Sequence, residues 1–318
     1  MFPDPGLGPE WESLALLAQI ALKSSTAVLL AAYGEIVAER SGVLNLGLEG
    51  MLLLGALAGF AAGAATGSPA AALCAAALAG ALAALVHGFF VISLGANQVL
   101  SGLALSLLGA GLTGVLGRGL IGAAGLVLPP VPLPGLADIP LLGPALFSQP
   151  LLTYLALVLA PLLWWGLART RLGLMVRACG EDAQAAYASG LPVRLVRYGC
   201  VCFGGALAGL GGAFLSLSYT PGWKEGLSAG QGWIAIAMVV FATWRPLRAL
   251  CGGLLFGALT AVQFSFQTEG AQLVPVWLLR AAPYLLTIVV LALVQSNARL
   301  RRNAGAPADL GRFFRPDG

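Results

Sequence analysis

Long apolar stretches broken by short polar segments organise this sequence. Residues 50–117 contain no Asp, Glu, Lys or Arg, and the stretches 119–168, 198–244 and 249–298 contain only one or two charged residues each. A helix of about 20 apolar residues crosses a bilayer, and runs such as AALCAAALAGALAAL lack the alternation that β-barrel strands require. The pattern therefore predicts a bundle of membrane-spanning helices.

The polar breaks divide the chain into about nine predicted spans. We place them at about 14–36, 46–66, 70–93, 98–117, 150–168, 195–217, 230–244, 249–267 and 275–295. The window 230–244 is too short to cross a bilayer upright, so we expect it to be tilted or partly interfacial. The predicted fold class is all-α, a single polytopic transmembrane domain over residues 1–318 with a basic C-terminal tail from about residue 296.

The composition agrees with a membrane protein. Hydrophobic residues make up 58% of the chain and charged residues only 9%. Soluble domains carry about 25% charged residues, so a soluble domain, a disordered chain, a coiled coil and a nucleic-acid binder are excluded. The 44 Gly suit close helix packing in membranes. We expect such packing at the pairs Gly55/Gly59, Gly205/Gly209 and Gly253/Gly257.

The cysteines and the few charges narrow the picture further. The five Cys form no CxxC motif, so we expect no metal site, no disulfide framework and no cofactor. If the predicted spans alternate in direction, one side receives most of the basic residues: Arg40, Arg169, Arg171, Arg177, Arg194, Arg197, Arg245, Arg248, Arg299, Arg301, Arg302, Arg312 and Arg315. The other side receives only Arg118 and Lys224.

This asymmetry predicts the orientation of the chain. Basic residues concentrate on the cytoplasmic side of membrane proteins, so we expect the C-terminus in the cytoplasm and the N-terminus outside. The first residues lack the basic region of a signal peptide, and we expect none. The net charge of +4 then reflects membrane topology and requires no nucleic-acid partner.

Polar residues inside predicted spans are costly and often functional. Asn45 and Glu49 begin the second span and are four residues apart, so they would share a helix face. This face either lines a solute pathway or fixes a helix break beside it. Glu39 and Arg40, just before it, suggest a solvated cytoplasmic turn.

A second polar group begins the fourth span. Asn97 and Gln98 suit N-capping with interhelical hydrogen bonding, which we favour slightly over pathway lining. The single histidine, His87, is expected to form a buried interhelical hydrogen bond rather than a proton relay. The Pro-rich segment 128–144 favours extended backbone, and we expect a packed connector on the outer side.

The segment 169–197 joins two spans on the basic side and is too patterned for a simple connector. Its centre, EDAQAAYAS at 181–189, predicts a short helix with acidic residues at its start and Gly190 as its stop. Such a helix suits a groove on another protein, whereas its small apolar face would bind a lipid surface only weakly. We therefore expect it to dock on a protein partner.

Several segments, in order, resemble a transporter family. RLGLMVRACGEDAQAAYASGLPVRLVRYGCVCFGGALAGLGGAFLSL at 171–217 resembles the core of ABC-transporter permeases of the ribose/branched-chain amino-acid group. ERSGVLNLGLEGMLLLGALAGF, GANQVLSGLALSLL and GLSAGQGWIAIAMVVF are similar to the nucleoside and simple-sugar permeases of that group. One departure is FATWRPLRA at 241–249, where the family usually has a sequence such as FGRWNPLGA, so this turn is more basic here.

The resemblance implies a permease subunit of an ATP-driven importer in the inner (plasma) membrane, with nucleosides or simple sugars as solutes. A branched-chain amino-acid permease is the alternative, and an autonomous secondary transporter is the competing class. The chain has neither a GxxxxGK[ST] P-loop nor a catalytic constellation, so we expect it not to be an enzyme. The expected partners are a separate cytoplasmic ABC ATPase, a second permease subunit of a related but different sequence, an extracytoplasmic solute-binding protein and the lipid bilayer.

The resemblance also assigns roles to residues. It implies that the segment around 173–190 is a coupling helix that docks in a groove of the ATPase. The coupling residues expected from it are Gly173, Arg177, Gly180, Glu181, Asp182, Ala185, Ala186, Ser189 and Gly190. The polar positions give the expected pathway residues as Asn45, Glu49, Asn97, Gln98, Gln231 and Trp233.

Overall fold

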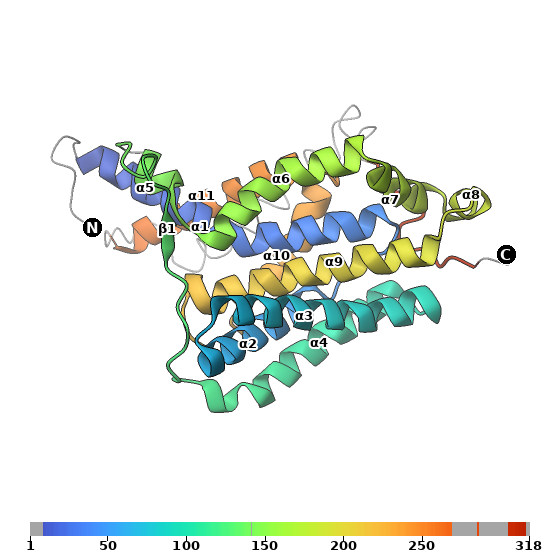
Figure 1. The fold of residues 1–318 in the computed structure, drawn as a ribbon, viewed down its shortest axis with the longest axis horizontal. Helices are drawn as coiled ribbons and strands as arrows, with labels where there is room; N and C mark the ends of the chain where they lie inside the picture. The colour runs from blue at the N-terminus through green and yellow to red at the C-terminus, as the bar shows by residue number, and fades with distance from the viewer. Residues whose placement is uncertain (1–8, 141, 269–284, 286–304, 316–318) are drawn as a thin grey trace.

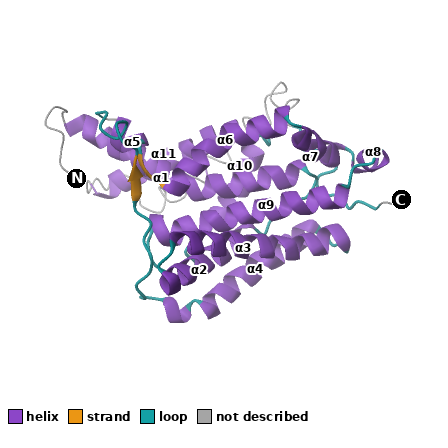
Figure 2. Ribbon diagram, in the orientation of Figure 1, coloured by secondary structure: helices purple, strands orange, loops and turns teal. Residues whose placement is uncertain are grey.

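The computed structural model describes residues 9–140, 142–268, 285 and 305–315, which form a bundle of helices (Figure 1). The helices are α1 (Pro9–Arg40), α2 (Leu48–Thr66), α3 (Pro69–Gly88), α4 (Gln98–Leu116), α5 (Leu142–Leu146), α6 (Leu151–Arg169), α7 (Arg171–Glu181), α8 (Ala183–Ala188), α9 (Val193–Phe214), α10 (Gln231–Phe241) and α11 (Pro246–Thr268). Single π-helical turns, Phe89–Ser93 and Leu215–Tyr219, extend α3 and α9. Figure 2 shows one short pair of strands in the described part of the chain, β1 (Pro130–Pro132) and β2 (Ser148–Pro150).

Seven described helical segments are long and apolar enough to cross a membrane. They are Ser13–Arg40, Leu48–Thr66, Pro69–Ser93, Gln98–Leu116, Leu151–Arg169, Val193–Tyr219 and Pro246–Gln263. The all-α class and seven of the predicted windows are thereby confirmed. The window 230–244 contains only the 11-residue α10. The predicted span 275–295 lies outside the described residues, so the expected total of nine stays a prediction.

Helix α9 lies in the middle of the bundle, against α1, α2 and α3 (Figure 1). Glycine makes these contacts possible. A Cβ on Gly55 of α2 would collide with the backbone of Gly209 in α9, and a Cβ on Gly209 would collide with that of Ala76 in α3. Gly257 of α11 meets Ala21 of α1 in the same way. The predicted small-residue contacts are therefore confirmed, since only Gly lets two helix backbones approach this closely.

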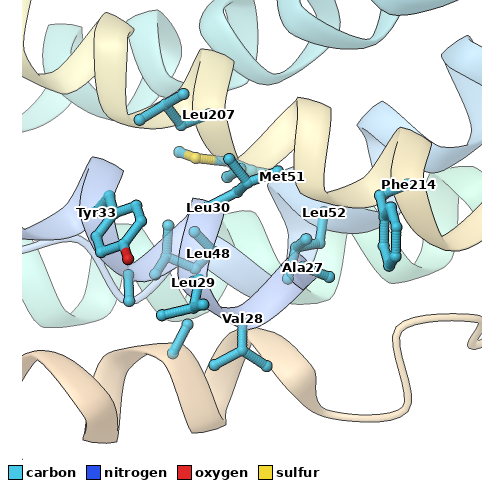
Figure 3. Close-up of a cluster of buried hydrophobic side chains, with 14 of the residues drawn as sticks. Ala27, Val28, Leu29, Leu30, Tyr33, Leu48, Met51, Leu52, Leu207 and Phe214 are labelled. Atoms are coloured by element: carbon cyan, nitrogen blue, oxygen red, sulfur yellow. The ribbon is translucent and has the colours of Figure 1, made fainter. Parts of the chain in front are cut away.

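Large apolar side chains of α1, α2 and α9 interdigitate beside these glycine contacts (Figure 3). Leu30, Tyr33, Met51, Leu52 and Phe214 are each at most 1% exposed. Lipid tails are as apolar as these side chains, so they stabilise the bundle through close van der Waals packing more than through release of water.

The two ends of the bundle carry different structures (Figure 1). One end carries α5 and the strand pair, in which Pro130 of β1 lies opposite Pro150 of β2 in an antiparallel ladder. The Pro-rich segment 128–144 is thus extended in part, as predicted, although α5 begins within it. The other end carries α7, α8 and the last described residues. The side of the membrane that each end faces stays a prediction from the basic residues.

Candidate functional site

The chain between α1 and α2 is irregular and lies inside the bundle. Five of the seven residues in 41–47 are buried. A Cβ on Gly102 of α4 would lie only 2.6 Å from the Leu46 nitrogen, so this loop runs against the first turns of α4. Ser106 Oγ, also from α4, donates a hydrogen bond to the Leu46 carbonyl at 2.8 Å. Irregular backbone within a membrane protein needs such internal partners, because lipid offers none.

Leu44, in the same loop, is held at both its backbone groups. Gln98 Oε1 at the start of α4 accepts a hydrogen bond from the Leu44 N–H at 2.7 Å. His87 Nε2 of α3 donates to the Leu44 carbonyl at 3.1 Å, and His87 Nδ1 lies 3.0 Å from Ser101 Oγ of α4. The predicted interhelical hydrogen bond of His87 is confirmed, and both its ring nitrogens are engaged in it.

Asn45 organises the loop from within. Its N–H donates to Glu35 Oε1 of α1 at 2.9 Å, and its side-chain Oδ1 accepts from the Gly47 N–H at 2.8 Å. The expectation that Asn45 and Glu49 share a helix face is wrong, because α2 begins only at Leu48. Asn side chains form local turns of this kind in competition with helix. These are the contacts of a residue that fixes a helix break.

Glu49 joins α2 to the beginning of α10. Its carboxylate accepts hydrogen bonds from Ser228 Oγ at 2.5 Å, from the Gly230 N–H at 2.9 Å and from the Gly232 N–H at 2.7 Å. The first N–H groups of a helix have no partner within it and favour a negative charge. Gly230 has a φ of 84°, a conformation that glycine adopts at little cost. The glutamate therefore fixes the point where α10 starts.

Helix α10 is half the length of a span, and acidic residues hold both its ends. Its 11 residues extend for about 16 Å, against a hydrocarbon core of about 30 Å. Beyond its last turn Trp244 Nε1 donates to a Glu39 carboxyl oxygen, and Arg40 Nε donates to the Trp244 carbonyl at 3.3 Å. The solvated turn expected at Glu39 and Arg40 is wrong for Glu39, which is 1% exposed.

The segment before α10 is also irregular and lies against α4. Trp223 and Leu227 are each 5% exposed, and Ser228 is 1% exposed. A Cβ on Gly114 of α4 would lie 3.0 Å from a Glu225 carboxyl oxygen. Two irregular segments, 41–47 and 220–230, thus meet at the half-buried Glu49, and we name this meeting point the Glu49 junction. Broken helices that meet in this way are typical of the binding sites of transporters.

Two expected pathway residues lie on α10 beside the junction. Gln231 is half-buried, and its Oε1 is buried without a hydrogen-bond partner among the described residues. Trp233 is 39% exposed. Glu35 and Ser228 belong to the junction without having been expected from the sequence. Glu35 gives one signal, since it lies one helical turn before Glu39 in an otherwise apolar span.

Asn97 lies away from the Glu49 junction, at the start of α4. Its Oδ1 accepts a hydrogen bond from the Leu100 N–H at 3.0 Å and so caps α4, as predicted. Asn97 also lines a cavity of about 580 Å³ between α3 and α4, together with His87, Ser101 and mostly apolar side chains. The structure therefore gathers Asn45, Glu49, Gln98 and Gln231 around the two irregular segments and leaves Asn97 at this cavity.

The predicted coupling helix consists of two helices, α7 and α8, with a break at Asp182. The Asp182 Oδ1 accepts a hydrogen bond from the Ala185 N–H at 2.8 Å and caps α8, and Gly190 follows with a φ of 83°. The predicted short helix with a glycine stop is confirmed. Glu181, Asp182, Ala185, Ser189 and Gly190 are exposed.

The other expected coupling residues are buried or half-buried. Ala186 is 5% exposed, and Arg177 is half-buried with its Nε donating to the Gly173 carbonyl at 3.4 Å. Gly173 and Gly180 are buried, and a Cβ on either would collide with backbone, that of Gly166 or of Arg40. These two glycines serve helix packing within the chain. No group of three or more metal-ligating side chains occurs among the residues that the structure describes.

Known proteins are similar to most of this chain. A family model described as the permease component of the branched-chain amino acid transport system matches residues 16–292. A putative glucose ABC transporter permease from Haloferax volcanii is 41% identical over 263 residues, which cover 81% of this chain and 80% of the relative. A nucleoside ABC transporter permease from Lactococcus lactis is 32% identical over 90% of this chain and 94% of its own length. A guanosine ABC transporter permease from Bacillus subtilis is 34% identical over 92% of this chain and 96% of its own length. No solved structure matches the chain.

Proposed function

Since this chain belongs to the permease-component family of branched-chain amino acid transport systems and is a multi-pass membrane permease of the ABC importer type, we propose that its solutes are nucleosides or simple sugars. The relatives support this choice, because their names give glucose, nucleosides and guanosine as solutes. Branched-chain amino acids are the second candidate, supported by the description of the family model. The family leaves an autonomous secondary transporter without support.

The Glu49 junction is the observation that supports the pathway best. It brings a half-buried carboxylate, the amides Asn45 and Gln231 and the irregular backbone of two segments close together. Hydroxyl-rich solutes such as sugars and nucleosides need donors and acceptors of this kind, and Trp233 beside them offers a ring for stacking. In this proposal Asn45, Glu49, Gln98 and Gln231 shape and line the pathway.

Energy reaches the junction from a separate cytoplasmic ATPase that docks on α8. The path from α7 to the junction is short. Gly180 of α7 packs on the Arg40 backbone, and Arg40 is followed directly by the loop 41–47. Movement of α7 and α8 would shift this loop and, through Glu49, the start of α10. A second permease subunit and an extracytoplasmic binding protein complete the importer, and residues 1–318 act as a single domain within it.

Reconstitution in proteoliposomes tests the solute and the source of energy. We expect uptake of radiolabelled guanosine or glucose only when the second permease subunit, the ATPase, ATP and the binding protein are present. Leucine uptake in the same vesicles would favour the second candidate. Uptake of any of these solutes by this chain alone would overturn the proposed coupling to ATP.

The docking of the ATPase on α8 is tested by a substitution on its exposed face. Ala185→Arg keeps a helix-forming residue and places a long side chain where a groove would have to fit. We expect the ATPase to be lost from the detergent-purified complex while membrane insertion is retained. Ala168→Arg at the exposed end of α6 is the matched control, and equal retention of the ATPase in both variants would overturn docking at this face. Gly180 is unsuitable for this test because any side chain there collides with Arg40.

A further inference from the structure

Residues 305–315 of the C-terminal tail lie on the coupling helices. The Asp309 N–H donates to the Gly180 carbonyl of α7 at 2.9 Å, and the Asp309 Oδ2 accepts from the Ala183 N–H of α8 at 2.8 Å. The Gly311 N–H donates to the Gly42 carbonyl at 3.2 Å. The tail therefore contacts α7, α8 and the loop that leads to the Glu49 junction.

An apolar contact accompanies these hydrogen bonds. Phe314 is 5% exposed and forms a small buried cluster apart from the main core. The other members of this cluster are Cys179, Ala183, Ala186 and Val193. The Phe314 ring centroid also lies 5.6 Å from that of Tyr187. Phe314 is the only aromatic residue buried in this cluster of described residues, so it supplies the largest side chain that packs beneath α8.

Helix α8 depends on such support because it is short. Its six residues are far fewer than an isolated helix needs to be stable. Its inner face offers only the methyl groups of Ala183 and Ala186. Two N–H groups at the start of α8 donate to carboxylates: the Ala185 N–H to Asp182 and the Ala183 N–H to Asp309. The tail therefore caps one of these two groups. Tyr187 and Ser189 are exposed, although the Tyr187 ring also lies beside Phe314.

Arg197 of α9 ties the tail to the rest of the molecule. It is 2% exposed, and its guanidinium donates to three backbone carbonyls. These are Ser41 at 3.1 Å, Cys179 at 3.2 Å and Arg312 at 3.2 Å. One buried charge thus joins the loop 41–47, α7 and the tail.

We propose that residues 305–315 are a positioning segment for coupling, in which Asp309 and Phe314 hold α8 in the place and shape that the ATPase engages. The inference rests on the proposed function for the identity of the partner, while the hold on α8 is a property of this chain. The tail also carries movement of α8 to Gly42 and the loop, so that uptake depends on it even where the ATPase is bound.

The accessibility of Cys179 tests the hold on α8. A full-length chain that keeps Cys179 as its single cysteine is labelled with a membrane-impermeant maleimide in inside-out vesicles. We expect Phe314→Ala to raise the labelling rate about tenfold, because truncating a buried ring leaves a cavity and lowers the cost of local opening. Phe314→Leu, which keeps apolar volume, is expected to restore slow labelling. Equal rates for Phe314→Ala and the unaltered side chain would overturn the proposal.

Uptake and ATP hydrolysis in the complete importer test the consequence for coupling. We expect Phe314→Ala and Asp309→Asn to lower the solute carried per ATP hydrolysed at least about fivefold, with rescue by Phe314→Leu. Arg194→Ala in α9 is the matched control, since Arg194 is exposed and lies outside residues 305–315. An unchanged solute-to-ATP ratio in the first two variants would overturn the positioning role. If no ATPase associates even with the unaltered chain, the proposed function fails, and the Cys179 labelling still decides the hold on α8.

Discussion

The carboxylate of Glu49 in the first turn of α2 accepts a hydrogen bond from the Gly232 N–H in the first turn of α10, at 2.7 Å. These residues are far apart in the sequence, and their contact unites the beginnings of two helices inside the bundle. A Cβ on Gly232 would lie 2.5 Å from the Glu49 Cα, so the backbones themselves are in contact here. The first turns of α2 and α10 are therefore packed directly on each other.

Glu49→Gln is expected to weaken the junction and abolish most uptake. The amide keeps one acceptor oxygen but turns its NH₂ group toward backbone N–H donors. Hydrogen bonds to a charged acceptor are worth about 1.5–3 kcal/mol each, so we expect a loss of stability of about that size. Thermal unfolding in detergent and uptake in proteoliposomes measure both effects. Glu225→Gln, which changes an exposed glutamate nearby, is expected to alter neither, and a similar loss there would argue against a specific role of Glu49.

Gly55→Ala is expected to disrupt the contact between α2 and α9. The added methyl group collides with the backbone of Gly209, which cannot move as a flexible side chain could. We expect a loss of more than about 2 kcal/mol, from overpacking. Gly199→Ala in α9 is the comparison, because its methyl group meets nothing within 4 Å. The second change should stabilise the helix by up to about 1 kcal/mol. Equal melting temperatures of the two variants would contradict the packing argument.

His87→Ala is expected to lower stability without changing the pH dependence of uptake. The substitution leaves the Leu44 carbonyl without its donor, at a cost of about 1–3 kcal/mol. His87→Gln keeps a donor and is expected to lose less. Uptake measured from pH 5.5 to 8 should retain the profile of the unaltered importer in both variants, apart from its amplitude. A profile that flattens in both would instead indicate that His87 carries protons.

Asn97→Ser is expected to leave uptake and stability nearly unchanged, whereas Asn97→Ala should lose about 1 kcal/mol. The reason is that Ser caps a helix as well as Asn does, and the observed contact of Asn97 is with the Leu100 N–H. Comparing the melting temperature and the uptake rate of the two variants separates the cap from a pathway role. A large loss of uptake in Asn97→Ser with normal stability would assign Asn97 to the pathway.

Cys179 is expected to react slowly with thiol reagents at pH values where an ordinary cysteine already reacts. Burial raises the pKa of the Cys179 thiol, and the opposing effect of the Arg197 charge is smaller. Because the folded pKa is raised, the neutral thiol stabilises the fold at pH values below the ordinary thiol pKa. This contribution is lost as the pH rises through the higher folded value. The alkylation rate of the single-cysteine chain is measured as a function of pH. We expect the rate to rise at a higher pH in the folded protein than in the unfolded protein, and coincident curves would contradict the shift.

Hydrophobicity and segment length alone indicate a membrane environment and most of the spans. An apolar window crosses a bilayer whatever its neighbours are, so seven windows could be placed from composition and length alone. The Gly190 helix stop, the Asn97 helix cap and the paired glycines of close helix packing can each be predicted from a few neighbouring residues. Residues that resemble a family likewise lie in short segments and can be recognised in the sequence.

The roles of the polar residues depend on how the helices pack, because their partners are distant in the chain. Gln98 holds Leu44, Glu49 holds the start of α10, and Asp309 caps α8. No periodicity encodes these pairs, since each forms when separate helices pack together. For the same reason the sequence predicts a solvated Glu39 beside the charged Arg40, whereas the distant Trp244 donates a hydrogen bond to it. Local hydrophobic patterns fix where the helices are, whereas hydrogen bonds across the bundle fix where they break and which of them are joined.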